Sequence, residues 1–264
     1  MFQRIKDCLC HPRSIGKYNK DRLGIVILTI FLFFLLSTGM QAARCYTSDP
    51  ISDSIPLAIT SSIIRDGDLN VQYSSSEHKL KGNSKTIEGK DISLYILPSE
   101  NERITYKLDK LIIILKEEEA LLYYSSQKAS SISYQDMQVK DFDLGNVASN
   151  NPTDTYHFRT FIDYVFDSAK LFFQTFDFIQ SFGSTILYYL ICVFFSYILS
   201  VAVNPTINRG VRAKLCFYDG CVFFIGTFFA YLFNIDIIIY FALMLPLIYT
   251  LITFRHIIKV VIRR

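Results

Sequence analysis

The sequence contains few charged residues for its length. Only 19% of its 264 residues are Asp, Glu, Lys or Arg, against about 25% in ordinary soluble domains. Hydrophobic residues make up 51% of the chain, and long apolar runs flank residues 44–180, which have the composition of a soluble domain. The apolar runs cover 23–36, 185–203, 221–233 and 237–254. This pattern excludes a fibrous, collagenous or wholly disordered chain.

The four apolar runs predict four transmembrane helices. A bilayer core about 30 Å thick is crossed by roughly 20 predominantly apolar residues in a helix. We predict spans at 23–41, 182–204, 217–233 and 235–254.

The uncharged stretch Leu23–Met40, at 18 residues, is longer than the apolar segment of a cleaved signal peptide, which covers about 7–15 residues. Met40 and Gln41 occupy positions where a cleavage site needs small residues. Arg44, directly before Cys45, is incompatible with a lipoprotein cleavage site. An uncleaved signal anchor is therefore favoured over a signal peptide.

Basic residues are absent from the predicted turn 234–236 between the third and fourth spans. They occur instead in the N-terminal segment 1–22, the loop 205–216 and the tail 255–264, which together hold 13 of the 27 Lys and Arg residues. Because basic residues that flank spans stay preferentially in the cytoplasm, both termini are predicted to be cytoplasmic. Residues 44–180 carry 14 basic against 20 acidic side chains. The net charge of +3 is therefore the sum of two oppositely charged parts. The basic residues beside the spans are explained by topology and by contact with anionic lipid, and they do not indicate nucleic-acid binding.

Between the first two spans, residues 42–157 predict a small extracytoplasmic domain that is rich in β-structure, of the α+β class. Gly67-Asp68 and Gly82-Asn83 are turn signals between short apolar runs. The continuously apolar run 111–115 is typical of a strand buried on both faces, and the acidic residues 117–119 predict a hairpin turn after it. Strands are expected around 69–74, 92–97, 103–107, 110–116, 119–125 and 131–134.

The pattern changes to a helical period in residues 158–181. Polar residues recur there every three or four positions, which predicts an amphipathic helix with an aromatic face. The favoured interpretation is that this face packs under the outer domain. The alternatives are a helix in the outer bilayer interface and a surface that docks a partner. The candidate contact residues for the alternatives are Phe161, Val165, Phe172 and Phe176.

A second amphipathic helix is predicted within residues 1–22, where Phe2, Ile5, Cys8 and Leu9 share one helical face. We expect this helix to lie on the cytoplasmic surface of the membrane.

Motifs of common catalytic and cofactor sites are missing. The sequence has no GxSxG, Walker A or GxGxxG pattern, and its four histidines are not spaced as metal ligands. Cys8, Cys10 and His11 lack a second ligand pair. Cys45 is the only cysteine of the outer domain, which excludes an internal disulfide there. We therefore predict no enzymatic activity, catalytic residue, metal or cofactor.

No charged residue lies at the centre of any predicted span. An ion-coupled or proton-coupled transporter normally needs one there, which argues against a solitary four-helix transporter. Asp219 lies at the cytoplasmic end of the third span, near Arg209, Arg212 and Lys214. We predict that Asp219 forms a structural salt bridge with one of them or sits at the membrane interface. A coupling role is the alternative, and all four residues are candidates for contact with the membrane or a partner.

Several short segments resemble those of one bacterial membrane-protein family. They are Leu9-Cys10-His11-Pro12-Arg13-Ser14-Ile15-Gly16, Arg22-Leu23-Gly24 and Asn208-Arg209-Gly210-Val211-Arg212-Ala213-Lys214-Leu215. The family has no established function, and some members are described as maltodextrin-utilisation proteins. Its members also have one span, an outer domain and three closing spans. The resemblance implies an association with carbohydrate uptake, beside the permease of an ABC importer, and no catalytic residues.

The leading hypothesis is a non-enzymatic accessory or sensory protein of the cell membrane, whose outer domain binds a partner or ligand. An auxiliary subunit of a permease complex is the second hypothesis, and a cell-envelope enzyme is the third. The expected partners are the lipid bilayer and another membrane protein.

Overall fold

A computed structural model of the protein describes residues 2–49, 54–66, 69–89, 91–99, 104–106 and 110–262. These residues form two compact units. The helical unit comprises Met1–Ser48 and Asp177–Arg264, and the sheet unit comprises Asp49–Phe176.

Four long helices form most of the helical unit, and each is long and apolar enough to cross a membrane. This finding confirms the prediction of four such helices. The elements of the unit are α1 (Phe2–Cys10), the 3-10 helix η1 (Pro12–Lys20), α2 (Leu23–Thr47), the second half of α5 (Pro152–Val203), α6 (Arg209–Phe233) and α7 (Ile237–Ile262).

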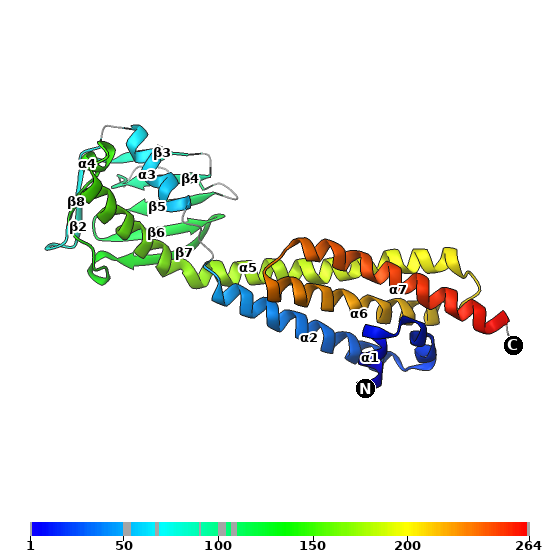
Figure 1. The fold of residues 1–264 in the computed structure, drawn as a ribbon. Coiled ribbons are helices and arrows are strands. Elements are labelled where there is room, and N and C mark those ends of the chain that lie inside the picture. The colour runs from blue at the N-terminus through cyan, green and yellow to red at the C-terminus, as the bar shows by residue number, and fades with distance from the viewer. Residues whose placement is uncertain are drawn as a thin grey trace. The chain divides into compact units, whose positions relative to one another are not determined.

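Helix α6 is the central helix of the unit and packs against α2 and α7 (Figure 1). Gly226 allows α6 and α7 to approach closely, because an added Cβ at this position would lie 2.4 Å from the Cβ of Ala242. The connection between the two helices is short. Asn234 adopts the left-handed conformation with a φ of 55° and closes the last turn of α6 through its backbone N–H.

The helix boundaries differ from the predicted ones: α2 continues past residue 41 to Thr47, and α7 continues past residue 254 to Ile262. Two larger differences have local causes. The amphipathic segment 158–181 and the span 182–204 form one continuous helix, α5, because no proline interrupts them. At about 1.5 Å per residue, its 52 residues extend over about 78 Å, more than twice the thickness of a bilayer core. The predicted loop 205–216 is mostly helical, because the Asn208 side chain caps α6 by accepting a hydrogen bond from the Gly210 N–H.

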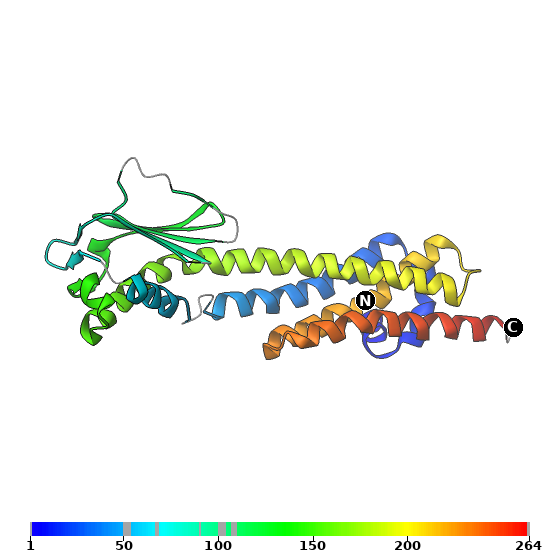
Figure 2. The same cartoon turned by 90° about the horizontal axis from the view of Figure 1, so that it is seen from above.

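The first 20 residues cap one end of the helical unit (Figure 2). The predicted N-terminal helix is confirmed as α1, and α1 and η1 both pack against α6. Cys8 and Ile15 are fully buried in this contact, whereas Phe2 is 81% exposed. The apolar face of α1 is therefore divided between the helix bundle and the surface.

The sheet unit contains eight strands in two sheets, as far as its described residues show. The first sheet has the order β2-β1-β8 and the second the order β3-β4-β5-β6-β7. Strands β4 and β5 pair in parallel, and the other pairs are antiparallel. The strands are β1 (Val71–Ser74), β2 (Lys79–Gly82), β3 (Lys85–Glu88), β4 (Ile92–Ile96), β5 (Leu111–Leu115), β6 (Glu119–Tyr124), β7 (Gln127–Ser133) and β8 (Phe142–Asp143).

The predicted buried strand is confirmed, since every residue of β5 is buried. A hairpin joins β5 to β6, closed by the hydrogen bond from the Lys116 N–H to the Glu119 carbonyl. The strand expected around 103–107 is wrong for residues 104–106, which form no strand. The rest of that range, and the Gly67-Asp68 turn signal, lie outside the described residues.

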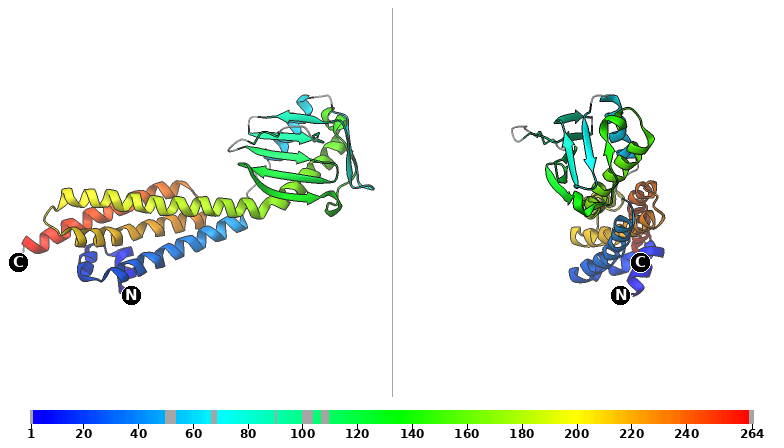
Figure 3. Two further views of the ribbon diagram at one scale, coloured as in Figure 1. Left: turned by 180° about the vertical axis from the view of Figure 1, so that it is seen from behind. Right: turned by 90° about the vertical axis from the view of Figure 1, so that its left-hand side faces the viewer.

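The amphipathic part of α5 packs against the larger sheet (Figure 3). Its apolar side chains join those of β4, β5 and β6 in one core. This packing confirms the favoured interpretation of the amphipathic helix. A sheet covered by a helix on one face is a common way to build a small α+β core.

Helix α3 (Ser54–Asp66) was not predicted. Its buried residues Ile59 and Ile63 lie one helical turn apart in the same core. Its hydroxyl groups bond back to carbonyl oxygens four residues earlier, as Thr60 does to Pro56. Serine and threonine weaken a helical pattern in the sequence, and this local bonding lets them fit inside the helix.

Candidate functional site: a polar pocket in the helical unit

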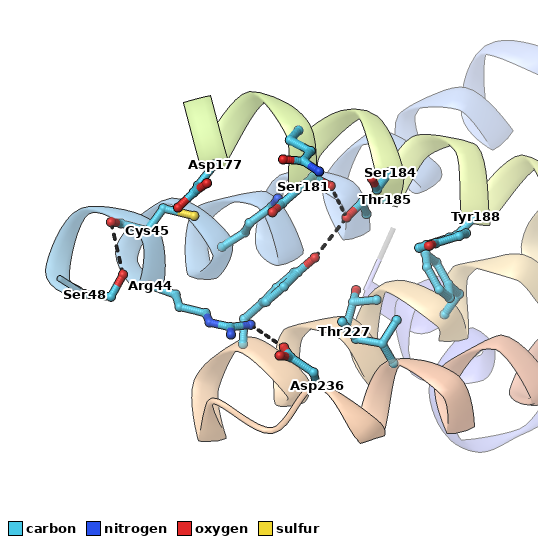
Figure 4. Close-up of a pocket in the computed structure, with 15 residues that line it drawn as sticks. Arg44, Cys45, Ser48, Asp177, Ser181, Ser184, Thr185, Tyr188, Thr227 and Asp236 are labelled. Atoms are coloured by element: carbon cyan, nitrogen blue, oxygen red, sulfur yellow. Dashed lines mark hydrogen bonds and ion pairs between the residues drawn. The ribbon is translucent and has the colours of Figure 1, made fainter. Parts of the chain in front are cut away.

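A polar pocket of about 370 Å³ opens at the end of the helical unit that carries the α6–α7 turn (Figure 4). Its volume falls within the range of small-molecule sites. Helices α2, α5, α6 and α7 all contribute to its wall. The lining residues are Gln41, Arg44, Cys45 and Ser48 of α2 and its end, Asp177, Gln180, Ser181, Ser184, Thr185 and Tyr188 of α5, Phe223, Thr227 and Tyr231 of α6, and Asp236 and Ile239 at the start of α7.

An ion pair lies at the wall of the pocket. The Arg44 guanidinium lies 2.7 Å from an Asp236 carboxylate oxygen, and its carbon lies 5.7 Å from the centroid of the Tyr231 ring. The Tyr231 hydroxyl is 3.0 Å from the Thr185 hydroxyl of α5. These contacts join all the helices of the wall around one aromatic ring, as Figure 4 shows.

Gln41 is the most unusual lining residue. Its side chain is fully buried, and neither its amide oxygen nor its amide nitrogen has a hydrogen-bond partner among the described residues. One turn earlier on α2, Ser37 bonds to Thr227 at 2.7 Å. The Ser37 hydroxyl therefore has a hydrogen-bond partner within the helical unit, whereas the Gln41 amide has none among the described residues. An unsatisfied buried amide is unfavourable, because its desolvation is not compensated.

Asp219 lies at the opposite end of the helical unit, under the N-terminal cap. It is fully buried, and its Oδ1 lies 2.8 Å from the Thr253 hydroxyl of α7. The same hydroxyl lies 3.0 Å from the Pro12 carbonyl oxygen. A threonine hydroxyl has one hydrogen, so Thr253 shares it between the Asp219 carboxylate and the Pro12 carbonyl.

Asp219 forms no salt bridge with Arg209, Arg212 or Lys214, so this part of the prediction is wrong, whereas its position at the membrane interface stays a prediction. Lys214 instead donates to the backbone carbonyl of Asp21 at 2.8 Å, and Arg209 is exposed in the first turn of α6. Arg212 is buried and donates to three carbonyl oxygens in the turn before α6, those of Asn204, Pro205 and Ile207. These three carbonyl oxygens lie 2.9, 3.2 and 3.1 Å from the guanidinium, so the turn itself supplies its hydrogen-bond acceptors.

The four apolar candidates of α5 lie in the sheet unit, and none of them lines the pocket. Phe161 and Val165 are fully buried in the sheet-unit core. The prediction that these two contact the membrane or a partner is therefore wrong, because their side chains reach neither. Phe172 and Phe176 are partly buried and stack on each other with centroids 6.4 Å apart.

Among the described residues, no group of three or more His, Cys, Asp or Glu side chains is arranged to hold a metal ion.

A charged cluster fastens the N-terminal cap to α6. Arg4 donates two hydrogen bonds to the Asp21 carboxylate, at 2.9 and 3.1 Å, and the Tyr218 hydroxyl donates a third at 2.6 Å. The Arg4 hydrogen bonds are the main reason why the pKa of Asp21 lies below its usual value. Asp21 is the residue that joins the cap, the start of α2 and α6.

Low pH should weaken the hydrogen bonds and ion pair of the Asp21 carboxylate. A carboxyl group whose folded pKa is lowered stabilises the fold fully above its unfolded pKa of about 3.9, and this contribution is lost as the pH falls through the folded pKa. We expect Asp21→Asn to lower the free energy of unfolding by about 1–3 kcal/mol at pH 7, with a smaller difference from wild type below about pH 4. Circular-dichroism melts of the two proteins in detergent between pH 7 and pH 3 measure this. A constant difference at every pH would contradict the assignment.

The pocket was not predicted from the sequence. Gln41 was considered only as part of a cleavage site, and the Arg44–Asp236 pair joins residues 192 positions apart. The signal that was available is a glutamine near the end of an apolar run, since polar residues within spans are often functional.

Comparisons of the chain with protein-family models, with curated proteins and with solved structures find no match.

Proposed function

We propose that the chain is a non-enzymatic accessory or sensory protein of the cell membrane that binds a ligand or partner on its extracytoplasmic side. Its four long helices would cross the bilayer with both termini in the cytoplasm. The observation that carries the proposal is the polar pocket beside the α6–α7 turn.

The charge distribution supports the orientation. Among the described residues, Arg44 is the only basic one that lines the pocket. The described basic residues Arg4, Arg212 and Lys214 lie at the other end of the helical unit, in or beside the N-terminal cap. Basic residues are enriched on the cytoplasmic side of spans, so the pocket would open on the opposite side.

The chemistry of the lining supports binding. Amides, hydroxyls and aromatic rings form most of the polar wall, and the one guanidinium is already paired with a carboxylate. Such groups recognise a ligand through hydrogen bonds and fix its orientation. The ligand was predicted to bind to the outer domain. It would instead bind to the helical unit, either alone or together with the outer domain.

The second candidate is an auxiliary subunit of a permease complex, of the carbohydrate ABC-importer kind. The sequence resemblance and the exposed apolar side chains of α5, such as Leu190 and Phe194, support it. In a bilayer these side chains could face either lipid or another protein. A cell-envelope enzyme is the third candidate.

Copurification distinguishes these candidates. The tagged full-length chain is extracted from its native membranes in mild detergent, and copurifying proteins are quantified against a tagged, unrelated four-span protein. The sensory or accessory proposal expects the chain to remain in membranes after an alkaline wash and to copurify with no permease in fixed stoichiometry. A stoichiometric permease would favour the second candidate, and release by the wash would contradict the membrane assignment.

A further inference from the structure

We propose that the polar pocket binds a small organic ammonium group that also carries hydrogen-bonding groups, of the ethanolamine class. This inference rests on the proposed function, since it names the ligand of the same pocket. It is based on two observations, the unpartnered amide of Gln41 and the charge balance of the pocket wall.

The first observation requires a polar occupant. The amide oxygen and nitrogen of Gln41 line the pocket and find no partner in the described part of the chain. Within a membrane no bulk water compensates such a group, so a buried amide is expected to be satisfied by a neighbouring polar group. An amide both donates and accepts, and its natural complement is a ligand with a hydroxyl or amino group.

The second observation selects the charge of the ligand. Arg44 and Asp236 compensate each other at 2.7 Å. Asp177 adds a carboxylate that points from α5 towards α2 (Figure 4). No basic side chain within the described ranges forms an ion pair with it. The wall therefore carries one more negative than positive charge, which favours a cation and disfavours a phosphate or carboxylate.

The remaining wall suits an ammonium head group. Tyr188 lines the pocket from α5, at the end of the pocket away from Asp177 (Figure 4). Ser181 and Ser184 add hydroxyl groups from the same helix. An ammonium would lie near Asp177, and its neighbouring hydroxyl or ester would reach Gln41. The same chemistry occurs in free amino alcohols and in the head group of phosphatidylethanolamine.

Cys45 makes the proposal testable without an introduced label. Its thiol lines the pocket and is partly exposed, whereas Cys10 is exposed at the other end of the helical unit. The full-length protein is placed in nanodiscs of phosphatidylglycerol at pH 7. The rate at which a methanethiosulfonate reagent modifies each cysteine is measured by mass spectrometry, with increasing ethanolamine hydrochloride at constant ionic strength.

We expect ethanolamine to slow the modification of Cys45 at least about fivefold at saturation and to leave Cys10 unchanged. Asp177→Asn and Gln41→Met should each raise the half-protecting concentration at least about tenfold. Asp167→Asn is the matched control, because it removes an exposed carboxylate on the same helix but outside the pocket. If Gln41→Met unfolds, the exposed position of Asp177 keeps Asp177→Asn as an independent test.

A second arm identifies the source of the ligand. Nanodiscs that contain phosphatidylethanolamine should protect Cys45 without added ethanolamine if the lipid head group occupies the pocket. Protection by free ethanolamine alone would indicate a soluble ligand, and both results support the proposal. Equal protection by glycerol, or no protection by any of these probes, overturns it. That failure leaves the proposed function intact, because membrane insertion and copurification are measured separately.

Discussion

Replacing Gly226 with leucine should separate α6 from α7 and lower the stability of the helical unit by about 3 kcal/mol, at the upper end of overpacking costs. A Cβ at this position would lie 2.4 Å from the Ala242 Cβ and 3.0 Å from its Cα. Neither atom is the flexible end of a side chain, so the two helices must move apart. Close packing of small residues is a main source of helix association in membranes.

Buried thiols report this change directly. Cys8, Cys192, Cys216 and Cys221 are buried in the helical unit, so a dye that fluoresces on reaction with thiols follows its thermal unfolding in detergent. Gly39→Leu is the matched control, because a Cβ at Gly39 on α2 would meet nothing within 4 Å. Equal melting temperatures for the two variants would show that α6 and α7 do not pack as described.

The second large effect is expected from Phe161→Ala in the sheet unit. The Phe161 ring lies 5.2 to 5.6 Å, between centroids, from the rings of Tyr134, Phe142 and Tyr73. Removing a buried phenylalanine from such a cluster costs about 3–5 kcal/mol, which is a large part of the stability of a small domain.

Limited proteolysis of the full-length protein measures the effect. We expect Phe161→Ala to make the sheet unit sensitive to protease while the helical unit stays protected. Leu171→Ala is the control, because Leu171 lies on the same helix and is 68% exposed. If Phe161 instead contacted membrane or partner, the isolated variant would resist protease as well as wild type does.

The sequence predicts the fold best where one physical requirement determines the pattern. Apolar runs of about 20 residues suffice to indicate the helices that could span a bilayer, and all four were found. The β5 strand was predicted because a short apolar run bounded by turns has few alternatives. The spacing of polar residues in 158–181 likewise indicated which face of α5 packs on the sheet.

Other features depend on contacts that no local pattern contains. Asp219 was expected to pair with one of three nearby basic residues. For Arg212 among them, the turn before α6 supplies carbonyl oxygens that bind the guanidinium. Asp219 meets Thr253, which lies on another helix. The pocket assembles from four helices, and Gln41 becomes conspicuous only when its neighbours leave both amide atoms without a partner.

The most direct test of the proposed topology is a measurement of the side of the membrane on which the pocket opens. Cys45 lies at the pocket and Cys10 in the N-terminal cap, and the other four cysteines are buried. Intact cells expressing the protein are treated with a membrane-impermeant thiol reagent, and Cys45→Ser and Cys10→Ser variants assign the modified residue. We predict modification of Cys45 in intact cells and of Cys10 only after the membrane is permeabilised. Modification of Cys10 in intact cells, with Cys45 protected until permeabilisation, would contradict the account.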